Sequence, residues 1–351
     1  MKGKMTTSSS GGYLFFSQLF RWLIFIAGAI LPIHILGAQA AAHPGARSVM
    51  DAHNCYPYYE WWSDRIDRAL ATGTPLAIEQ DLGWYTDKKT GKSWSIVTHA
   101  VPGYGHEPTM KQYFFERVRP IVEKALREGN RKDWPLITLN LDFKTEEPEH
   151  LRAVLALLHE YQDWLTTAPR TSDNSPHPLD VKPILVLTGE SDAQQKVFYD
   201  DVPVGDKILL FGAAHTNEKN PMAAPEVLES DKATNYRRWW NNPWAVVEEG
   251  GQNKAGEWTK ADNIRLRALV EHAHQNGLWI RFYTLDGLDN KADLSCHGWF
   301  SGYNFGSLSA AELRWRAALI AGVDYIASDQ YETLGSFIKE NQSVAGTNVA
   351  H

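Results

Sequence analysis

Short β-branched and apolar runs alternate along the chain with longer segments that have one apolar and one polar face. The short runs predict strands buried on both faces, and the longer segments predict helices. The runs that predict strands cover residues 47–53, 76–82, 137–143, 183–188, 207–211, 245–248, 279–285 and 325–328. The sixth run carries the weakest signal, because its flanks are rich in Trp, Asn and Gly. Regular alternation of strand and helix indicates parallel βαβ units.

The predicted helices include residues 113–128, 150–165, 261–276 and 310–321. The last two end at Asn276-Gly277 and Ala321-Gly322, which are helix-stop signals. Eight strands separated by helices in one domain predict a single (β/α)₈ TIM barrel over residues 45–340. Active sites of such barrels lie where the strands end, so polar residues at those positions are the candidates for function.

The first 40 residues have the pattern of an export signal. Lys2, Lys4 and Arg21 precede or open an apolar run over residues 22–36, and small residues follow over 37–42. This order predicts a signal peptide cleaved after Ala40, with an uncleaved N-terminal anchor as the alternative. Either way we expect an exported protein, whether periplasmic, secreted or membrane-tethered. At the other end, residues 341–351 are expected to form a disordered tail.

Composition narrows the class of partner. The 351 residues carry a net charge of −7, which does not favour binding to nucleic acid. The two cysteines, Cys55 and Cys296, lie too far apart in sequence for a cysteine zinc site, and whether they form a disulfide is left open.

Carboxylates gather at the predicted strand ends. Glu79 and Asp81 are two residues apart, so on a strand they point to the same side. The third strand brings Asp142 and Lys144 in the same spacing. Carboxylates aimed into one barrel mouth repel each other unless a cation offsets their charge, and oxygen ligands suit Ca²⁺ or Mg²⁺. The ordinary alternatives are a surface-facing acidic pair and a simple ion pair.

Two histidines fall near the same strand ends. His53 closes the first strand, and His99 follows a short apolar run. Imidazoles titrate near neutral pH, so one could accept a proton from a nucleophile while the other donates one to a leaving oxygen. A metal and Lys144 would stabilise the negative charge of a phosphodiester transition state. A structural hydrogen-bonding role is the alternative for His53.

The chain resembles the phosphatidylinositol-specific phospholipase C-like phosphodiesterase superfamily over about residues 47–338. The motifs that carry this resemblance are His53-Asn54, Glu79-Gln80-Asp81 and His99. The resemblance implies catalysis by His53 and His99. It also implies a metal site, with Ca²⁺ favoured over Mg²⁺, whose ligands are Asn54, Glu79, Asp81 and Asp142.

Two branches of this superfamily are relevant. Glycerophosphodiester phosphodiesterases share the Glu-x-Asp pair but usually have Arg where this chain has Asn54, and a Glu-Asn-Thr motif that is missing here. The ending from Ala321 to Asp329 is similar to that of the family around the "altered inheritance of mitochondria" protein. The resemblance therefore implies a phosphoric diester hydrolase whose substrate is a phospholipid, an inositol phospholipid or a glycerophosphodiester. A transient contact with a membrane surface and the oligomeric state are left open.

Further residues are expected at the mouth. Arg281 could bind a phosphate or head group, and Asp329 could brace that arginine. Trp84, Trp299 and Tyr303 are candidate groove aromatics. A metal-dependent amidohydrolase is disfavoured, because Asp51-Ala52-His53 breaks the His-x-His motif of that class. A secreted barrel that binds a ligand without turnover remains the alternative function, although no histidine or acidic ligand is missing.

Overall fold

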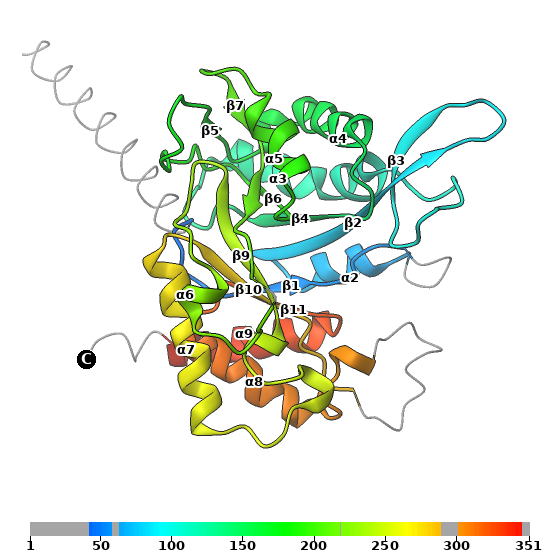
Figure 1. The fold of residues 1–351 in the computed structure, drawn as a ribbon. Coiled ribbons are helices and arrows are strands. Elements are labelled where there is room, and N and C mark those ends of the chain that lie inside the picture. The colour runs from blue at the N-terminus through cyan, green and yellow to red at the C-terminus, as the bar shows by residue number, and fades with distance from the viewer. Residues whose placement is uncertain (1–41, 58–62, 218, 289–300, 346–351) are drawn as a thin grey trace, which may run out of the picture.

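Eight parallel strands close into a barrel in the computed structural model, which describes residues 42–57, 63–217, 219–288 and 301–345 (Figure 1). β1 pairs with both β2 and β11, and this double pairing closes the ring. The barrel strands in spatial order are β1 (Val49–Ala52), β2 (Leu76–Thr86), β4 (Ile137–Phe143), β6 (Ile184–Thr188), β8 (Phe211–Ala213), β9 (Arg237–Pro243), β10 (Trp279–Tyr283) and β11 (Tyr325–Ser328). The predicted (β/α)₈ TIM barrel is confirmed.

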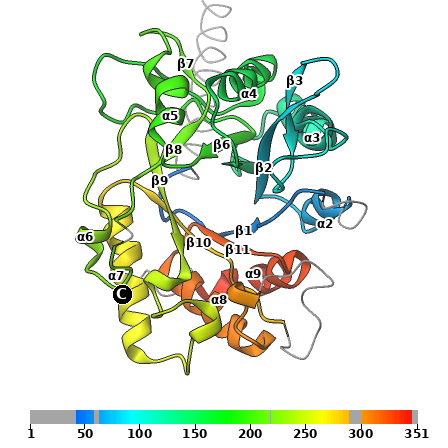
Figure 2. The same ribbon diagram turned by 45° about the vertical axis from the view of Figure 1, so that its right-hand side comes forward.

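Helices surround the barrel on its outer side (Figures 1 and 2). They are α2 (Arg65–Ala71), α3 (Glu116–Glu128), α4 (Pro148–Glu160), α5 (Asp192–Gln195), α6 (Pro225–Leu228), α7 (Lys260–Gln275), α8 (Leu308–Ala321) and α9 (Tyr331–Ala345). Single helical turns are formed by Lys111–Phe115, Gln162–Trp164, Lys196–Asp200, Trp244–Val246, Gln252–Lys254 and Ser301–Tyr303. Local sequence sets the helix ends: Thr259 and Asp262 form a reciprocal cap on α7, and Gly322 ends α8 in a left-handed conformation.

The barrel strands are buried on both faces, but the two faces differ in chemistry. Apolar residues such as Ile78 and Ile280 alternate with polar residues such as Glu79 and Arg281. Arg281 on β10 contacts Glu79 on β2, although β1 and β11 lie between these strands. Such a contact can only run through the barrel interior, so the polar face lines the interior and the apolar face packs on the helices.

Two of the predicted strands are misplaced. Residues 245–248 were expected to form the sixth strand, but the barrel uses β9, and Trp244–Val246 is a helical turn. The fifth strand was placed too early, because Lys207–Ile208 forms β7, which pairs with β5 (Ala168–Pro169) outside the barrel. In β9 the strand-favouring residues are Trp239 and Trp240, which stand between a pair of Arg and a pair of Asn, so the strand depends on pairing with its neighbours β8 and β10.

The strand β3 (Ser93–Val97) also lies outside the predicted set. β2 continues past its last pairing with β4 and turns back as β3, which pairs antiparallel with it. This hairpin projects from the barrel (Figure 1). At the C-terminus, α9 runs to Ala345, so the expected tail from residue 341 begins within a helix.

The predicted signal at residues 1–40 and the segment 346–351 lie outside the described residues. Within the described ranges, no helix is long and apolar enough to cross a membrane.

Candidate active site

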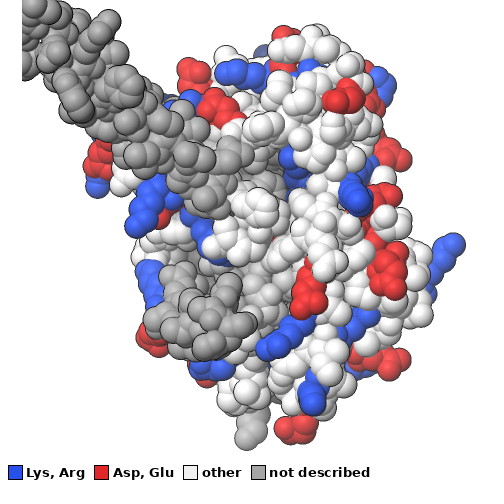
Figure 3. All heavy atoms as spheres, turned by 90° about the vertical axis from the view of Figure 1, so that its left-hand side faces the viewer, with Lys and Arg blue, Asp and Glu red and all other residues white. Residues whose placement is uncertain are grey.

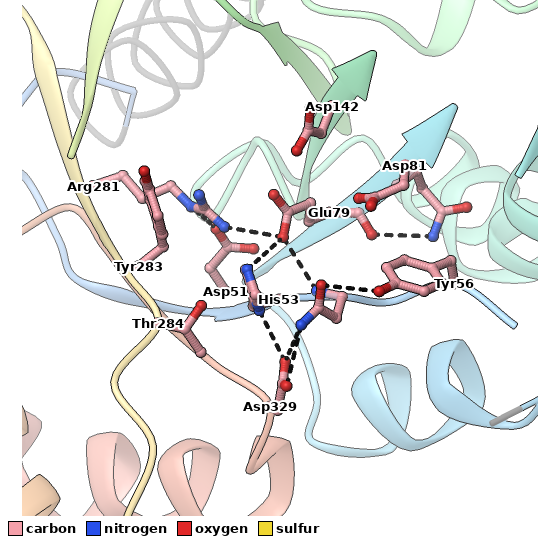
Figure 4. A network of polar contacts seen from close by, with 12 residues as sticks. Asp51, His53, Tyr56, Glu79, Asp81, Asp142, Arg281, Tyr283, Thr284 and Asp329 are labelled. Carbon is pink, nitrogen blue, oxygen red and sulfur yellow. Dashed lines mark hydrogen bonds and ion pairs between the residues drawn. The ribbon is translucent and has the colours of Figure 1, made fainter. Parts of the chain in front are cut away.

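Three predicted metal ligands converge where β2 and β4 end. The parallel register sets Asp81 beside Asp142 and Glu79 beside Asn140. One carboxylate oxygen each of Glu79, Asp81 and Asp142 lies within 4.8 Å of the others. Glu79 and Asp81 are buried, whereas Asp142 is half-buried at the rim. Adjacent strands thus place three acidic groups around one point, as the sequence predicted (Figure 4).

Lys144 lies against this acidic cluster. Its Nζ is 2.7 Å from Asp142 Oδ2 and 3.2 Å from Asp81 Oδ2. Burial opposes the charged form of Lys144, but the carboxylates of Asp81 and Asp142 outweigh it and raise the pKa of the ammonium group. Asp81 Oδ2 nevertheless makes no hydrogen bond within the described residues, and burial raises the pKa of Asp81, with the Glu79 carboxylate adding to the effect. The single ammonium group of Lys144 therefore does not neutralise the three carboxylates of the cluster.

His53 is held between two carboxylates (Figure 4). Its Nδ1 lies 2.9 Å from Asp329 Oδ1, and its Nε2 lies 3.5 Å from Glu79 Oε2. Burial alone would lower the pKa of the imidazole, but Glu79 and Asp329 raise it to about 9. The contact with Asp329 fixes the ring orientation, because an imidazole nitrogen bound to a carboxylate cannot rotate without losing that partner.

Asn54 links the two carboxylates that flank His53. Its backbone N–H donates to Glu79 Oε2 at 3.1 Å, and its side-chain amide donates to both oxygens of Asp329 at 3.2 Å. Its Oδ1 accepts from the Tyr56 hydroxyl. Asn54 has a φ of 51°, which makes it the single non-glycine residue with positive φ in the described part of the chain. The predicted metal ligand Asn54 thus borders the acidic cluster in a backbone conformation that side-chain-bearing residues rarely adopt.

Buried side chains grip the backbone on which His53 and Asn54 sit. The Tyr331 hydroxyl donates to the carbonyl of His53 at 2.6 Å, and the Arg65 guanidinium donates to the carbonyl of Asn54. The Gln80 amide donates to the carbonyl of the next residue, Cys55. Three consecutive carbonyls are therefore held by residues from α9, α2 and β2. This grip stabilises the left-handed turn and aims His53 and Asn54 inward.

Arg281 is bound inside the barrel rather than open to a ligand. Its guanidinium donates to Asp51 Oδ2 and, at 3.0 Å, to Asn241 Oδ1, and it lies 3.3 Å from Glu79 Oε2. The side chain is 1% exposed. Burial would raise the pKa of Glu79, but Arg281 and then His53 lower it to about 2. The expectation that Asp329 braces Arg281 was wrong: Asp51 and Glu79 do so, because they lie across the interior from β10.

His99 reaches the mouth by way of the hairpin. The backbone N–H of Thr98 donates to the Asp81 carbonyl at 2.9 Å, so β3 returns the chain to the acidic cluster. The His99 ring is exposed and stacks on Tyr56 with 5.8 Å between ring centroids. Partial burial lowers the pKa of His99, and the Lys144 charge lowers it further. Because Tyr56 also binds Asn54, the two histidines border one mouth.

The candidate groove aromatics separate into different environments. Tyr303 stands edge-on to His53 at 5.7 Å, and Tyr283 lies parallel to His53 at 6.3 Å. Trp84 instead stacks on His150 at 5.4 Å. The remaining candidate, Trp299, and the cysteine Cys296 lie outside the described residues, so a disulfide to the buried Cys55 stays open.

Sequence reasoning missed several partners in the site. Asp51 is two residues before His53 on β1 and thus shares its inward face, a spacing that could have indicated its role. Tyr56 and Tyr283 had no such signal. Asp286 receives the backbone N–H of Asp329 at 2.8 Å, and burial followed by the Asp329 charge raises the pKa of Asp286 to about 8.

The charges of the site do not balance within the described residues. The acidic groups are Asp51, Glu79, Asp81, Asp142, Asp286 and Asp329. The cationic partners are His53, Arg65, Lys144 and Arg281. Burial of like charges is costly unless a cation neutralises them. The excess of carboxylates, of which three converge within 4.8 Å, fits a divalent cation with oxygen ligands.

No protein-family model and no curated protein matches the chain. Several solved structures are similar to it. A glycerophosphoryl diester phosphodiesterase from Parabacteroides distasonis ATCC 8503 shares 13% identity, with 87% of this chain and 90% of that chain covered and a TM-score of 0.41. A calcium-dependent phosphoinositol-specific phospholipase C from Pseudomonas sp shares 14% identity, with 82% and 90% covered and a TM-score of 0.43.

A 7,8-dihydropteroate synthase from Vibrio fischeri ES114 is similar to the same degree, with 13% identity, 86% of this chain and 94% of that chain covered, and a TM-score of 0.38. Likenesses this distant carry no argument about chemistry. Strand pairing and the side chains of the mouth themselves define a (β/α)₈-barrel protein with an acidic, histidine-bearing site.

Proposed function

We propose that this chain is a metal-dependent phosphoric diester hydrolase that acts on a phospholipid, an inositol phospholipid or a glycerophosphodiester. One observation carries the proposal: the carboxylates of Glu79, Asp81 and Asp142 converge beside His53, with His99 on the same mouth. A cation site next to two imidazoles at the open end of a barrel combines the groups that phosphodiester cleavage requires.

The metal would be held by Glu79, Asp81 and Asp142, with Asn54 as a fourth candidate ligand. When bound, the cation would act as a Lewis acid that stabilises negative charge on the phosphoryl oxygens. The donor oxygens lie within 4.8 Å of one another, a spread that a cation with ligand distances of about 2.4 Å can bridge. Oxygens within this limit fit either ion, and we propose Ca²⁺ rather than Mg²⁺ because the resemblance carried by the His53-Asn54 and Glu79-Gln80-Asp81 motifs implies it.

His53 and His99 divide the proton transfers. One imidazole accepts the proton of the attacking hydroxyl or water, and the other donates a proton to the leaving oxygen. Asp329 holds His53 through Nδ1, which leaves Nε2 facing Glu79 and the cation site. His99 is exposed on the mouth, where it can meet a substrate without rearrangement of the barrel.

The two cationic side chains take different parts. Lys144 borders the mouth beside Asp81 and Asp142 and can neutralise a phosphoryl oxygen there. Arg281 is buried in the barrel interior and bound by Asp51 and Glu79. It therefore positions the Glu79 carboxylate and does not contact a ligand.

Hydrolysis assays test this function. The purified chain is offered bis(p-nitrophenyl) phosphate, a glycerophosphodiester and an inositol phospholipid, each with Ca²⁺, with Mg²⁺ and with excess chelator. We expect turnover of at least one diester that chelation abolishes and Ca²⁺ restores. Turnover unaffected by chelation would remove the metal from the proposal, and binding of a diester without turnover would favour the non-catalytic alternative.

We also propose that residues 1–40 direct export and are removed after Ala40. The charged start, apolar run and small residues of this segment support the proposal. N-terminal sequencing of the mature protein from its own host tests it, because a mature chain that begins before residue 40 would indicate an anchor or no processing.

A further inference from the structure

The hairpin that carries His99 forms a compact arm at the barrel mouth, which we call the mouth arm (residues 84–107). Tyr85 and Trp94 pack across the two strands with ring centroids 4.9 Å apart. The loop after His99 folds back on the hairpin so tightly that a Cβ on Gly105 would lie 2.3 Å from the Tyr85 ring. Strands and loop are therefore packed into one unit.

The tip of the mouth arm is basic. Lys88, Lys89 and Lys92 are exposed, and none of them forms an ion pair with any described residue. The nearby Asp87 carboxylate accepts the backbone N–H groups of Lys89 and Thr90 and so holds the turn at the tip of the arm. Three lysines therefore present free positive charge at the end of an arm, in a chain whose net charge is −7.

Apolar side chains lie exposed on the same arm, next to the catalytic candidate. Val101 is 50% exposed and Tyr104 is 56% exposed, and both follow His99 within five residues. The acidic residue of this loop, Glu107, accepts the backbone N–H groups of Tyr104 and Gly105, so its carboxylate is held within the loop. Basic groups beside an exposed Tyr and Val are the combination that binds the interface of an anionic bilayer.

The position of the arm fits such a contact. β2 leaves the barrel at its C-terminal end, which is the mouth, and the hairpin reaches outward on that side (Figure 1). On the face of the molecule turned toward the left-hand side of Figure 1, acidic and basic groups lie interspersed (Figure 3). The arm thus combines unpaired positive charge with nearness to His99, as a surface that directs the mouth to lipid would.

We propose that the mouth arm docks the barrel mouth on an anionic lipid bilayer. Lys88, Lys89 and Lys92 contact the phosphates of the lipid head groups, and Val101 and Tyr104 enter the interface. This inference rests on the proposed function and narrows it: the substrate is a phosphodiester presented in a lipid surface, which reaches His99 and the acidic cluster while the arm is bound.

Vesicle co-sedimentation tests the docking surface. The full mature chain is mixed with vesicles of phosphatidylcholine alone and with vesicles of equal parts phosphatidylcholine and phosphatidylserine. We expect binding to the anionic vesicles only, weakened by salt because salt screens exposed charge. Replacement of all three arm lysines by serine should weaken binding on the order of a hundredfold, since each lysine near such a surface contributes about a fivefold factor.

A matched variant controls for net charge. Lys124, Lys132 and Lys207 are exposed near the opposite end of the barrel, so their replacement by serine removes the same charge far from the mouth. We expect this variant to bind anionic vesicles like the unmodified chain. Tyr104→Ser should remove part of the binding that persists in high salt, since that part depends on apolar contact.

The outcomes separate the two proposals. Equal binding by the two triple variants, or no preference for phosphatidylserine, would overturn the docking surface even if the protein hydrolyses soluble diesters. Lysine-dependent binding without hydrolysis of any diester would support the surface and count against the proposed function. Both triple variants should retain full turnover of bis(p-nitrophenyl) phosphate, because none of the six lysines belongs to the site.

Discussion

The two ends of the barrel hold buried charge in different ways. At the N-terminal end, Asp324 accepts the backbone N–H groups of Gly45 at 2.7 Å and Ile280 at 2.9 Å, and contacts His274 Nε2 at 2.9 Å. There a single carboxylate is satisfied by backbone donors and joins the segment before β1 to β10.

At the mouth, carboxylates face one another instead. Glu79, Asp81 and Asp142 approach within 4.8 Å. Their partners among the described residues are mainly side chains, with one backbone N–H, that of Asn54, donating to Glu79. A buried carboxylate with matched partners stabilises the fold. Several carboxylates that face one another lower the stability of the fold but raise its affinity for a cation. We therefore expect substitutions at the mouth to change turnover and metal binding, and substitutions at the N-terminal end to change the free energy of unfolding.

The largest effect is expected at the histidines. His53→Ala removes an imidazole held between Asp329 and Glu79, and turnover should fall about a hundredfold to ten-thousandfold, the range typical for loss of an acid–base group. His99→Ala should have a comparable effect. Steady-state kinetics and circular dichroism measure turnover and folding together. A folded variant with unchanged turnover would exclude that histidine from the mechanism.

The next effect concerns the acidic cluster. Asp81→Asn keeps the shape of the side chain but removes one of three facing carboxylates. We expect weaker Ca²⁺ binding by calorimetry and a thermal midpoint raised by about a few degrees in the metal-free protein, because repulsion is relieved. Lower metal-free stability would show that Asp81 is held as a structural group, and the contrast between the two ends would fail.

A smaller loss of turnover is expected from the backbone grip. Arg65→Ala removes the donor to the Asn54 carbonyl, and we expect turnover to fall about tenfold as His53 and Asn54 lose their orientation. Arg65→Lys should restore part of it. Arg68→Ala is the matched control on the same helix, because Arg68 is half-buried and pairs with Glu332 instead of the Asn54 carbonyl. Weaker Ca²⁺ binding in Arg65→Ala alone would separate positioning from a general loss of stability.

The smallest effect on turnover is expected at the N-terminal end. Asp324→Ala leaves the buried backbone N–H of Ile280 and the part-buried N–H of Gly45 without this acceptor and should lower the free energy of unfolding by about 2 kcal/mol. Asp324→Asn, which keeps an acceptor, should lose less. Urea denaturation measures the stability, and turnover per folded molecule should match that of the unmodified chain. Reduced turnover in folded protein would mean that the two ends are coupled.

Local sequence determined much of this protein. The apolar runs at Ile137–Phe143 and Tyr325–Ser328 form strands that are buried between the barrel interior and the surrounding helices. Their bounds could be predicted from the sequence. The two-residue spacing of Glu79 and Asp81 places both carboxylates on the same face of β2. The register of β2 with β4 then turns that face into the barrel. Glycine after a periodic segment predicted where α8 ends.

Closure of the barrel decided the rest. Asp329 binds His53 from 276 positions away because β1 and β11 are neighbours only once the ring has closed. Arg281 meets Asp51 and Glu79 across the interior for the same reason. β9 is a strand because its neighbours supply hydrogen-bond partners that its own residues do not predict. A local pattern specifies which way a side chain points, but only the packed fold specifies what it meets.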